Sequence, residues 1–446
     1  MKARYDSAPV SDGVRPVTEC RVCGSDDWAE VVSFGPVPLA NAYLDPADSY
    51  DGERYYPLDV VSCRACRLMS LTHVVDPEIL FRSYSYVTPD SVTINRHMRR
   101  VVELCRERSA LAEGELVVEI GSNTGAQLSV FGETGTRILG VDPARNLAAT
   151  ANARGVPTLP EFFSSAVARD IAAEHGRAKL ILGRHVFAHI DDIAEVAAGV
   201  RALLDRAGVF VIEVPYALDL IEKLAFDTIY HEHLSYFAVE PLAALFERHG
   251  LRVLDVERMP VHGGSILVFV GHASGPLPVR PAVAELLALE ERSGLYDDAV
   301  YERFARDVDR VRDELSAMVR GFAADGLRVA GYGAPAKGNT LLNVCGLGAD
   351  ELVFCSDSTE LKQGKVLPGT HIPVRPPDYA RANPPDCYLL LAWNYAEEIL
   401  HKESAFLAGG GRFILPVPKP WLVPSAEAGA PGLSGLSAFP GSSGPR

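Results

Sequence analysis

The sequence contains no apolar run that approaches membrane-spanning length, and its first residues carry Arg4, Asp6 and Asp12 without the apolar segment of a signal peptide. We therefore expect a cytoplasmic protein. Basic residues are also few: 43 Lys and Arg against 58 Asp and Glu give a formal net charge of -15. This balance argues against a general nucleic-acid binder, which needs a basic face. Any anionic ligand must therefore be bound by polar or basic groups of its own binding site, and not by a broad basic surface.

Cysteine is scarce too, with eight residues in 446, and in a cytosolic chain these are expected to be thiols or metal ligands rather than disulfides. Four of them form two Cys-x-x-Cys pairs, Cys20 with Cys23 and Cys63 with Cys66. Two such pairs suit a closed zinc site of four thiolates, which leaves no open coordination position and therefore serves folding. Two redox-inert thiol pairs or a labile disulfide are the alternatives.

The dinucleotide pattern Gly-x-Gly-x-x-Gly is missing from the first strand, turn and helix of the main domain. An apolar run at 116–120, which includes Glu119, is followed by Gly121 and Gly125 in the spacing Gly-x-x-x-Gly. The glycines would let the backbone approach a ligand, and Glu119 would repel a diphosphate. A cationic or neutral nucleoside fits this turn better. An ordinary strand-turn-helix without a ligand is the alternative.

A second strand is expected at 137–141, and it ends at Asp142, where a carboxylate could grip a ribose diol beside the first turn. Glu-x-Gly-x-x-x-Gly followed by this acid resembles motifs I and II of the class I S-adenosylmethionine methyltransferases, which implies a sulfonium cofactor. Phe162 is a plausible platform for adenine. The expected cofactor-binding residues are Glu119, Gly121, Asn123, Gly125, Asp142, Pro143, Phe162 and His185.

Strands and helices alternate along most of the chain, which favours an α/β fold with doubly wound sheets and ligands at the carboxyl ends of the strands. A second strand-turn-helix begins near 327, so two Rossmann-like halves are expected. A chain of this length should also divide into several domains, each with its own hydrophobic core. The expected parts are a zinc module at 1–75, a methyltransferase domain at 76–280, a Rossmann-like domain at 281–422 and a disordered tail at 423–446.

The segment Tyr230-His231-Glu232-His233-Leu234-Ser235-Tyr236 follows the fifth strand of the first sheet. Four proton-handling side chains in a row fit the hydrophobic face of neither a helix nor a strand, and a loop at this place would lie over the cofactor cleft. We expect the catalytic residues to lie in this segment. A metal site on His-x-His and a purely structural polar loop are the alternatives. A glycine-rich turn at 261–265 is expected to share the rim.

The second strand-turn-helix carries Gly331, Gly333 and Lys337, so its turn is basic. A helix N-terminus beside a lysine suits a phosphate or a sugar diphosphate better than a sulfonium. A solvated lysine in a purely structural domain is the alternative reading of this turn.

The order of these motifs, ending in Gly-Tyr-Gly-Ala-Pro-Ala-Lys-Gly-Asn-Thr, resembles the nucleotide-deoxysugar C-methyltransferases of deoxysugar and antibiotic pathways. The resemblance covers about residues 20 to 421 and implies an S-adenosylmethionine domain, a structural Zn2+ and an NDP-4-keto-6-deoxysugar substrate. It further implies that His233 is the base, with Tyr230 and Glu232 beside it and with His189 and Tyr84 lining the sugar pocket. Further substrate contacts are expected from Tyr86, His262, Gly263, Tyr332, Lys337 and Asn339.

The implied chemistry is methylation of carbon, at C3 or in some members at C5 of a dTDP-sugar. A sulfonium methyl is already electrophilic, so the protein must make a carbon nucleophile by removing the proton beside a ketone. No metal is needed for this step. Methylation of oxygen or nitrogen on a sugar or natural product, and a nucleotide sensor without catalysis, are the rival functions. We expect a monomer that binds neither nucleic acid nor membrane.

Overall fold

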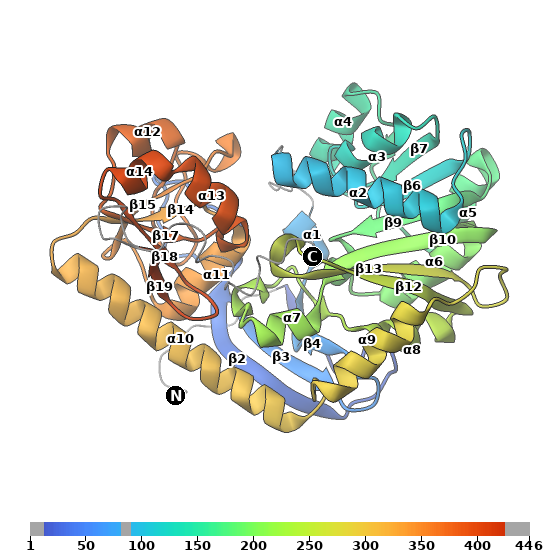
Figure 1. Cartoon of the computed structure of the whole chain (residues 1–446), viewed down its shortest axis with the longest axis horizontal. Coiled ribbons are helices and arrows are strands. Elements are labelled where there is room, and N and C mark those ends of the chain that lie inside the picture. The colour runs from blue at the N-terminus through green and yellow to red at the C-terminus, as the bar shows by residue number, and fades with distance from the viewer. Residues whose placement is uncertain (1–12, 82–90, 424–446) are drawn as a thin grey trace.

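The computed structural model describes residues 13–81 and 91–423. The expected sugar-pocket residues Tyr84 and Tyr86, and the expected tail from residue 424 onward, lie outside the described residues. Figure 1 shows two α/β lobes, with the N-terminal strands β2 and β3 beneath them and the long helix α10 running along the base. Within the described part of the chain, every helix is too short or too polar to span a bilayer.

The N-terminal region forms a four-stranded antiparallel sheet in the order β11-β4-β3-β2. Three strands are consecutive in the chain, and the fourth, β11, comes from the segment that follows the fifth strand of the central sheet. A separate two-stranded sheet pairs β1 with β5. The bounds are β1 Val14–Pro16, β2 Trp28–Pro38, β3 Tyr55–Cys63, β4 Met69–Leu71, β5 His73–Val75 and β11 Ser235–Tyr236.

The central sheet has seven strands in the order β12-β13-β10-β9-β6-β7-β8, and β13 alone runs against its neighbours. All five residues of β6 are buried, as expected for a strand covered by helices on both faces. Strand β8 has only two residues. The strands are β6 Leu116–Ile120, β7 Arg137–Val141, β8 Thr158–Leu159, β9 Ala178–Arg184, β10 Leu204–Pro215, β12 Leu251–Met259 and β13 Ser265–His272.

Helices cover both faces of this sheet and connect its parallel strands. Ser91 caps helix α2 by accepting a hydrogen bond from the Ile94 N–H. The helices are α2 Val92–Ser109, α3 Ala126–Gly132, α4 Arg145–Ala153, α5 Ser165–His175, α6 Ile193–Leu203 and α8 Val239–Arg248, with the shorter α1 Pro77–Phe81, α7 Ala217–Glu222, η1 Phe187–His189, η2 Phe226–Thr228 and η3 Val261–Gly263.

The C-terminal sheet has six strands in the order β16-β15-β14-β17-β18-β19, parallel except for β19 at the edge. Two Rossmann-like sheets are therefore present, and the expected α/β class is confirmed. Helices α9 and α10 connect them, and α10 packs along β2. The remaining elements are α9 Pro281–Arg292, α10 Asp298–Ala324, β14 Val329–Tyr332, α11 Ala336–Cys345, β15 Leu352–Ser356, η4 Glu360–Lys362, β16 Val374–Arg375, α12 Pro377–Ala382, β17 Cys387–Leu390, η5 Trp393–Tyr395, α13 Ala396–Lys402, α14 Ser404–Ala408, β18 Arg412–Leu415 and β19 Trp421–Val423.

Candidate active site

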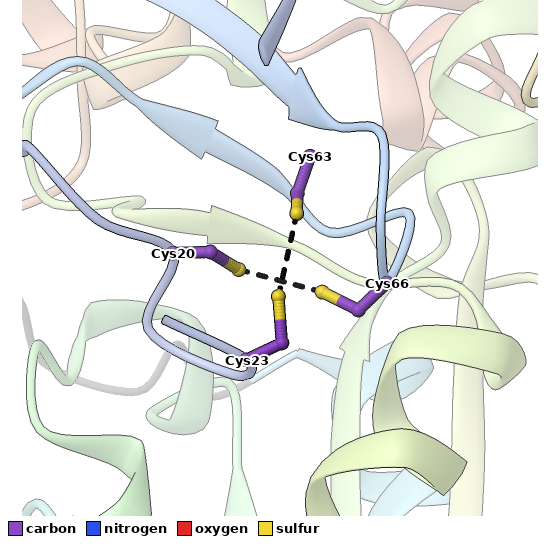
Figure 2. Close-up of side chains that lie close together, drawn as sticks. All are labelled: Cys20, Cys23, Cys63 and Cys66. Atoms are coloured by element: carbon purple, nitrogen blue, oxygen red, sulfur yellow. Dashed lines mark hydrogen bonds between the residues drawn. The ribbon is translucent and has the colours of Figure 1, made fainter. Parts of the chain in front are cut away.

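The four expected zinc ligands converge on one point at the end of β3 (Figure 2). Their sulfur atoms all lie within 4.8 Å of one another, with 3.4 Å between Cys20 and Cys66 and 3.5 Å between Cys23 and Cys63. Tetrahedral zinc with Zn–S bonds of about 2.3 Å separates its ligands by about 3.8 Å. The four thiolates therefore fit a closed zinc site with no coordination position left for chemistry.

The zinc module holds the segment that carries His233. Strand β11 pairs with β4, and the backbone N–H of Leu71 donates to Leu234 O at 3.0 Å. Arg21 lies between the first two cysteines, where its guanidinium contacts Ser70, Leu234 O at 3.3 Å and the Asp191 carboxylate at 2.9 Å. The four-cysteine module thus anchors the chain next to His233.

A single cavity of about 1150 Å³ joins the carboxyl ends of the parallel strands of both sheets. Its size suits two small ligands side by side, since common ligand pockets measure about 300–1,000 Å³. The expected site residues on its wall are Glu119, Gly121, Asn123, Asp142, Pro143, Phe162, His185, His189, Tyr230, His233, Tyr332 and Lys337.

Several expected site residues do not line this cavity. Gly125, Glu232, Gly263 and Asn339 are absent from its wall, and the side chain of His262 lies outside the described residues. Asn339 is buried and donates weakly to Ala40 O, at 3.4 Å. Glu232 is buried and accepts a hydrogen bond of 2.6 Å from Asn41, which does line the cavity. Glu232 therefore reaches the site through Asn41 and not by direct contact.

The glycines of the first turn allow close packing against neighbouring segments. A Cβ on Gly121 would lie 2.6 Å from Val186, and one on Gly125 would lie 2.7 Å from Val156. Gly121 (φ +69°), Asn123 (φ +53°) and Gly125 (φ +77°) all have left-handed backbone, which favours glycine and tolerates asparagine. Close contact between segments is therefore one reason for both glycines, and Gly121, which lines the cavity, stays a predicted point of ligand approach, whereas Gly125 does not line it.

Two buried carboxyl groups flank this turn. Asp142 accepts hydrogen bonds from the N–H groups of Asn123 at 2.7 Å and Ala144 at 2.9 Å, so its carboxylate is held at the end of β7. Glu119 is 4% exposed, and burial raises its pKa to about 8. Its Oε2 is buried and has no hydrogen-bond partner within the described residues. An unsatisfied buried oxygen of this kind fits a ligand group that would complete it.

A buried charge cluster near the turn joins His185, an expected cofactor-binding residue, to three residues that the sequence analysis did not single out. Glu213 on β10 is fully buried and is contacted by His97 at 2.7 Å, Arg184 at 2.7 Å and His185 at 3.4 Å. Burial alone would raise the pKa of Glu213, but Arg184 and His185 hold it well below its usual range. Arg184 also donates to Gln127 at 2.6 Å and lines the cavity. The cluster therefore holds Arg184 and Gln127 in place on the cavity wall beside the first turn.

The hydrogen bonds of His233 fix its tautomer. Its Nδ1 lies 2.7 Å from Thr228 O, and because a carbonyl can only accept, Nδ1 carries the proton. Its Nε2 lies 2.8 Å from the Tyr230 hydroxyl and is therefore an acceptor. Burial lowers the pKa of His233 to about 4, so the ring is neutral at pH 7. A neutral imidazole can remove a proton once a substrate displaces the Tyr230 hydroxyl from Nε2.

The neighbouring histidines differ in their surroundings. The His189 ring lies edge-on to His233 with 4.9 Å between centroids, and burial holds the pKa of His189 well below its usual value. His231 is buried and donates to Tyr56 O at 3.1 Å, away from the cavity wall. Since His231 and His233 bond different neighbours, the segment holds no shared metal site on these two rings.

The second turn has the same arrangement as the first. Asp357, which follows β15, accepts hydrogen bonds from the N–H groups of Ala334 at 2.7 Å and Thr359 at 2.8 Å, as Asp142 does from its own turn. Lys362 donates to Ala334 O at 2.9 Å and lies 3.6 Å from Asp357. The basic turn predicted from the sequence is therefore accompanied by a carboxylate. The sequence does show this acid, because Asp357 directly follows the apolar run that forms β15.

Three family models together match most of the chain. A zinc binding domain matches residues 20–81, a methyltransferase domain matches 94–256, and a C-methyltransferase C-terminal domain matches 260–418. The curated C-methyltransferase NovU of Streptomyces niveus is 55% identical over 419 residues, which is 94% of this chain and all of that protein.

Solved structures resemble only part of the chain. The magnesium protoporphyrin IX methyltransferase of Synechocystis, with bound SAM, is 11% identical with a TM-score of 0.31, covering 42% of this chain and 86% of its own. A SAM-dependent methyltransferase from Anabaena variabilis is 15% identical with a TM-score of 0.32, covering 43% of this chain and 99% of its own. The assignment therefore rests on the sequence relatives. This chain belongs to the C-methyltransferase family, and it is an S-adenosylmethionine-dependent methyltransferase with a zinc-binding N-terminal module.

Proposed function

We propose that this enzyme methylates a carbon of a nucleotide-linked 4-keto-6-deoxysugar. The resemblance favours a dTDP-sugar as the substrate and C3 as the methylated carbon. The observation that carries the proposal is the neutral, oriented His233, which lines a cavity shared by both Rossmann-like sheets. A base at this meeting point can act on a substrate held by the C-terminal sheet beside a cofactor held by the central sheet.

The cofactor half of the site is assigned to the turn after β6. Asp142 would accept the ribose hydroxyls, the face of Phe162 would lie against adenine, and the unsatisfied oxygen of Glu119 would meet a polar group of the cofactor. S-adenosylmethionine supplies an electrophilic methyl group when it is bound. The protein's own task is then to generate the carbon nucleophile and align it.

The nucleophile would form by proton transfer to His233 Nε2. The carbonyl of Thr228 stabilises the imidazolium that results, because it already accepts from Nδ1. Tyr230 and His189 both line the cavity close to His233 and are placed to donate a hydrogen bond to the developing enolate oxygen. A positioned base contributes about 10²–10⁴-fold, and an oxyanion donor about 10²–10³-fold.

The first test is incubation of the purified enzyme with S-adenosylmethionine and a dTDP-4-keto-2,6-dideoxyhexose in heavy water. We expect a product heavier by one methyl group, with solvent deuterium exchange at a single carbon. Exchange at C3 supports the proposed position, whereas exchange at C5 moves the reaction to the other side of the ketone. Methylation of a hydroxyl without any carbon exchange would contradict the enolate route.

Replacing Asp142→Asn should weaken cofactor binding. The amide keeps the size of the side chain but removes its charge, and a hydrogen bond to a charged group is worth about 1.5–3 kcal/mol. We therefore expect a Kd for S-adenosylmethionine about 10- to 100-fold higher, measured by calorimetry. Asp357→Asn, the matching change in the second turn, is the control and should leave this Kd unaltered. Equal Kd values for both variants would refute the assignment of Asp142.

A further inference from the structure

The short helix η2 connects the proposed base to a second group of residues. Its last residue, Thr228, accepts the Nδ1–H of His233 at 2.7 Å. The preceding residue, Asp227, is fully buried and accepts a hydrogen bond of 2.6 Å from the indole N–H of Trp393 on η5. Two adjacent residues therefore hold the base on one side and an aromatic ring of the C-terminal lobe on the other.

Lys337 lies on that aromatic ring. Its Nζ is 4.3 Å from the ring centroid of Trp393, within the range of a cation–π contact. Gly263 makes room for the ring, because a Cβ at that position would lie 2.8 Å from it. The ammonium group is thus placed by Trp393, and Trp393 is placed by the helix that also orients His233. Lys337 and His233 line the same cavity.

The positive charge of the Lys337 ammonium is only partly neutralised by its neighbours. Asp227 on η2 favours the ammonium form of Lys337, and the charge of Lys337 in turn helps to lower the pKa of His233. Burial lowers the pKa of Lys337 to about 8 in spite of Asp227, so the group is still cationic at pH 7. A half-buried cation facing a cavity is suited to an anion that forms there during reaction.

We propose that Lys337 is a catalytic residue whose ammonium stabilises the enolate oxygen formed when His233 removes the proton beside the ketone. This inference rests on the proposed function and replaces the expectation that Lys337 binds the diphosphate. Trp393 is its positioning residue, and Asp227 fixes Trp393. Lys402 on α13 and Arg381 on α12, the latter paired with Asp378, also line the cavity and supply cationic groups for the diphosphate.

The step is balanced without further reactants. The C–H bond beside the ketone breaks, its proton moves to His233 Nε2, and its electron pair becomes the C=C bond of the enolate while the carbonyl oxygen gains negative charge next to Lys337. The enolate carbon then forms a bond to the methyl group as the S–CH3 bond breaks, and the oxygen returns to a carbonyl. S-adenosylhomocysteine leaves with the electron pair of that bond, and His233 returns its proton to water.

The test is Lys337→Met, which keeps the length of the side chain and removes its charge. At saturating substrate we expect kcat and the rate of deuterium exchange beside the ketone to fall about 10²–10³-fold. The Kd for dTDP, the probe for nucleotide and diphosphate binding, should stay within about threefold of wild type by calorimetry, since Lys337 is assigned to the ketone end. Lys337→Arg, which retains a cation, should recover part of the lost exchange. Lys365→Met, at an exposed lysine paired with Asp45, is the matched control and should behave as wild type.

Two results would overturn the assignment: exchange by Lys337→Met at the wild-type rate, or a dTDP Kd raised tenfold or more with kcat retained, which would return Lys337 to the diphosphate. Wild-type enzyme separates these failures from failure of the proposed function. If wild type neither methylates nor exchanges, the proposed function is wrong and this inference falls with it. If wild type exchanges and Lys337→Met exchanges equally fast, this inference alone is wrong.

Discussion

Replacing His233→Asn should leave an enzyme that binds S-adenosylmethionine and dTDP but exchanges the proton beside the ketone about 10²–10⁴-fold more slowly. The asparagine amide can still donate to Thr228 O in place of Nδ1, so the segment keeps its anchor. What is lost is the Nε2 lone pair that faces Tyr230. Deuterium incorporation followed by mass spectrometry measures the loss, and calorimetry checks that both ligands still bind.

The matched control is His175→Asn at the end of α5, which is away from the cavity wall and should retain wild-type exchange. Unimpaired exchange in His233→Asn would remove His233 from the role of base. The pH dependence offers a second check. Because burial lowers the pKa of His233 from 6.5 to about 4, the neutral base persists well below pH 6.5 in the free enzyme.

The same shift affects stability. Between about pH 4 and 6.5 the unfolded chain binds a proton on this histidine that the folded chain does not, so this group's contribution makes stability rise with pH in that window.

Replacing Cys63→Ser should remove both the metal and the activity. Structural zinc sites contribute about 10–16 kcal/mol of apparent binding free energy at pH 7, which is more than the whole stability of most domains. The fourth strand of the zinc module's sheet is β11, which begins two residues after His233, and Arg21 of the first Cys-x-x-Cys pair contacts Leu234 O. Loss of the module should therefore release the base and lower methyl transfer by more than about 10²-fold.

Metal analysis of protein purified without chelator measures this prediction directly. Wild type should carry one zinc per chain, and Cys63→Ser close to none. Cys105→Ser is the matched control, because Cys105 is also buried but lies on α2 outside the four-cysteine cluster. A wild-type preparation with well under one zinc per chain, or a zinc-free variant with full activity, would contradict the role given to the metal.

Much of the fold follows from local patterns in the sequence. The strands around 116–120 and 137–141 are read correctly because buried parallel strands are continuous apolar runs, and the polar residue that ends each run marks the ligand edge of the sheet. The two Cys-x-x-Cys pairs predict a zinc site because each pair can supply two corners of a tetrahedron. Spacing along the chain was enough for both conclusions.

Residues 230–233 show where local pattern fails. The sequence presents four similar side chains in a row, and only the tertiary structure separates Tyr230 and His233, which face the cavity, from His231 and Glu232, which bond to Tyr56 and Asn41 of the zinc module. The direction of each side chain depends on β11 pairing with a strand more than 160 residues earlier in the chain.

The sequence by itself therefore determined the class of the enzyme, its zinc ligands and the two strand-turn-helix units, since these are written in residues close together along the chain. Only the tertiary structure decided that Glu213 gathers His97 and Arg184, and that Trp393 brings Lys337 to the helix holding His233. The physical reason is that charge pairing and ring stacking act over a few ångströms in space, whatever the separation in sequence.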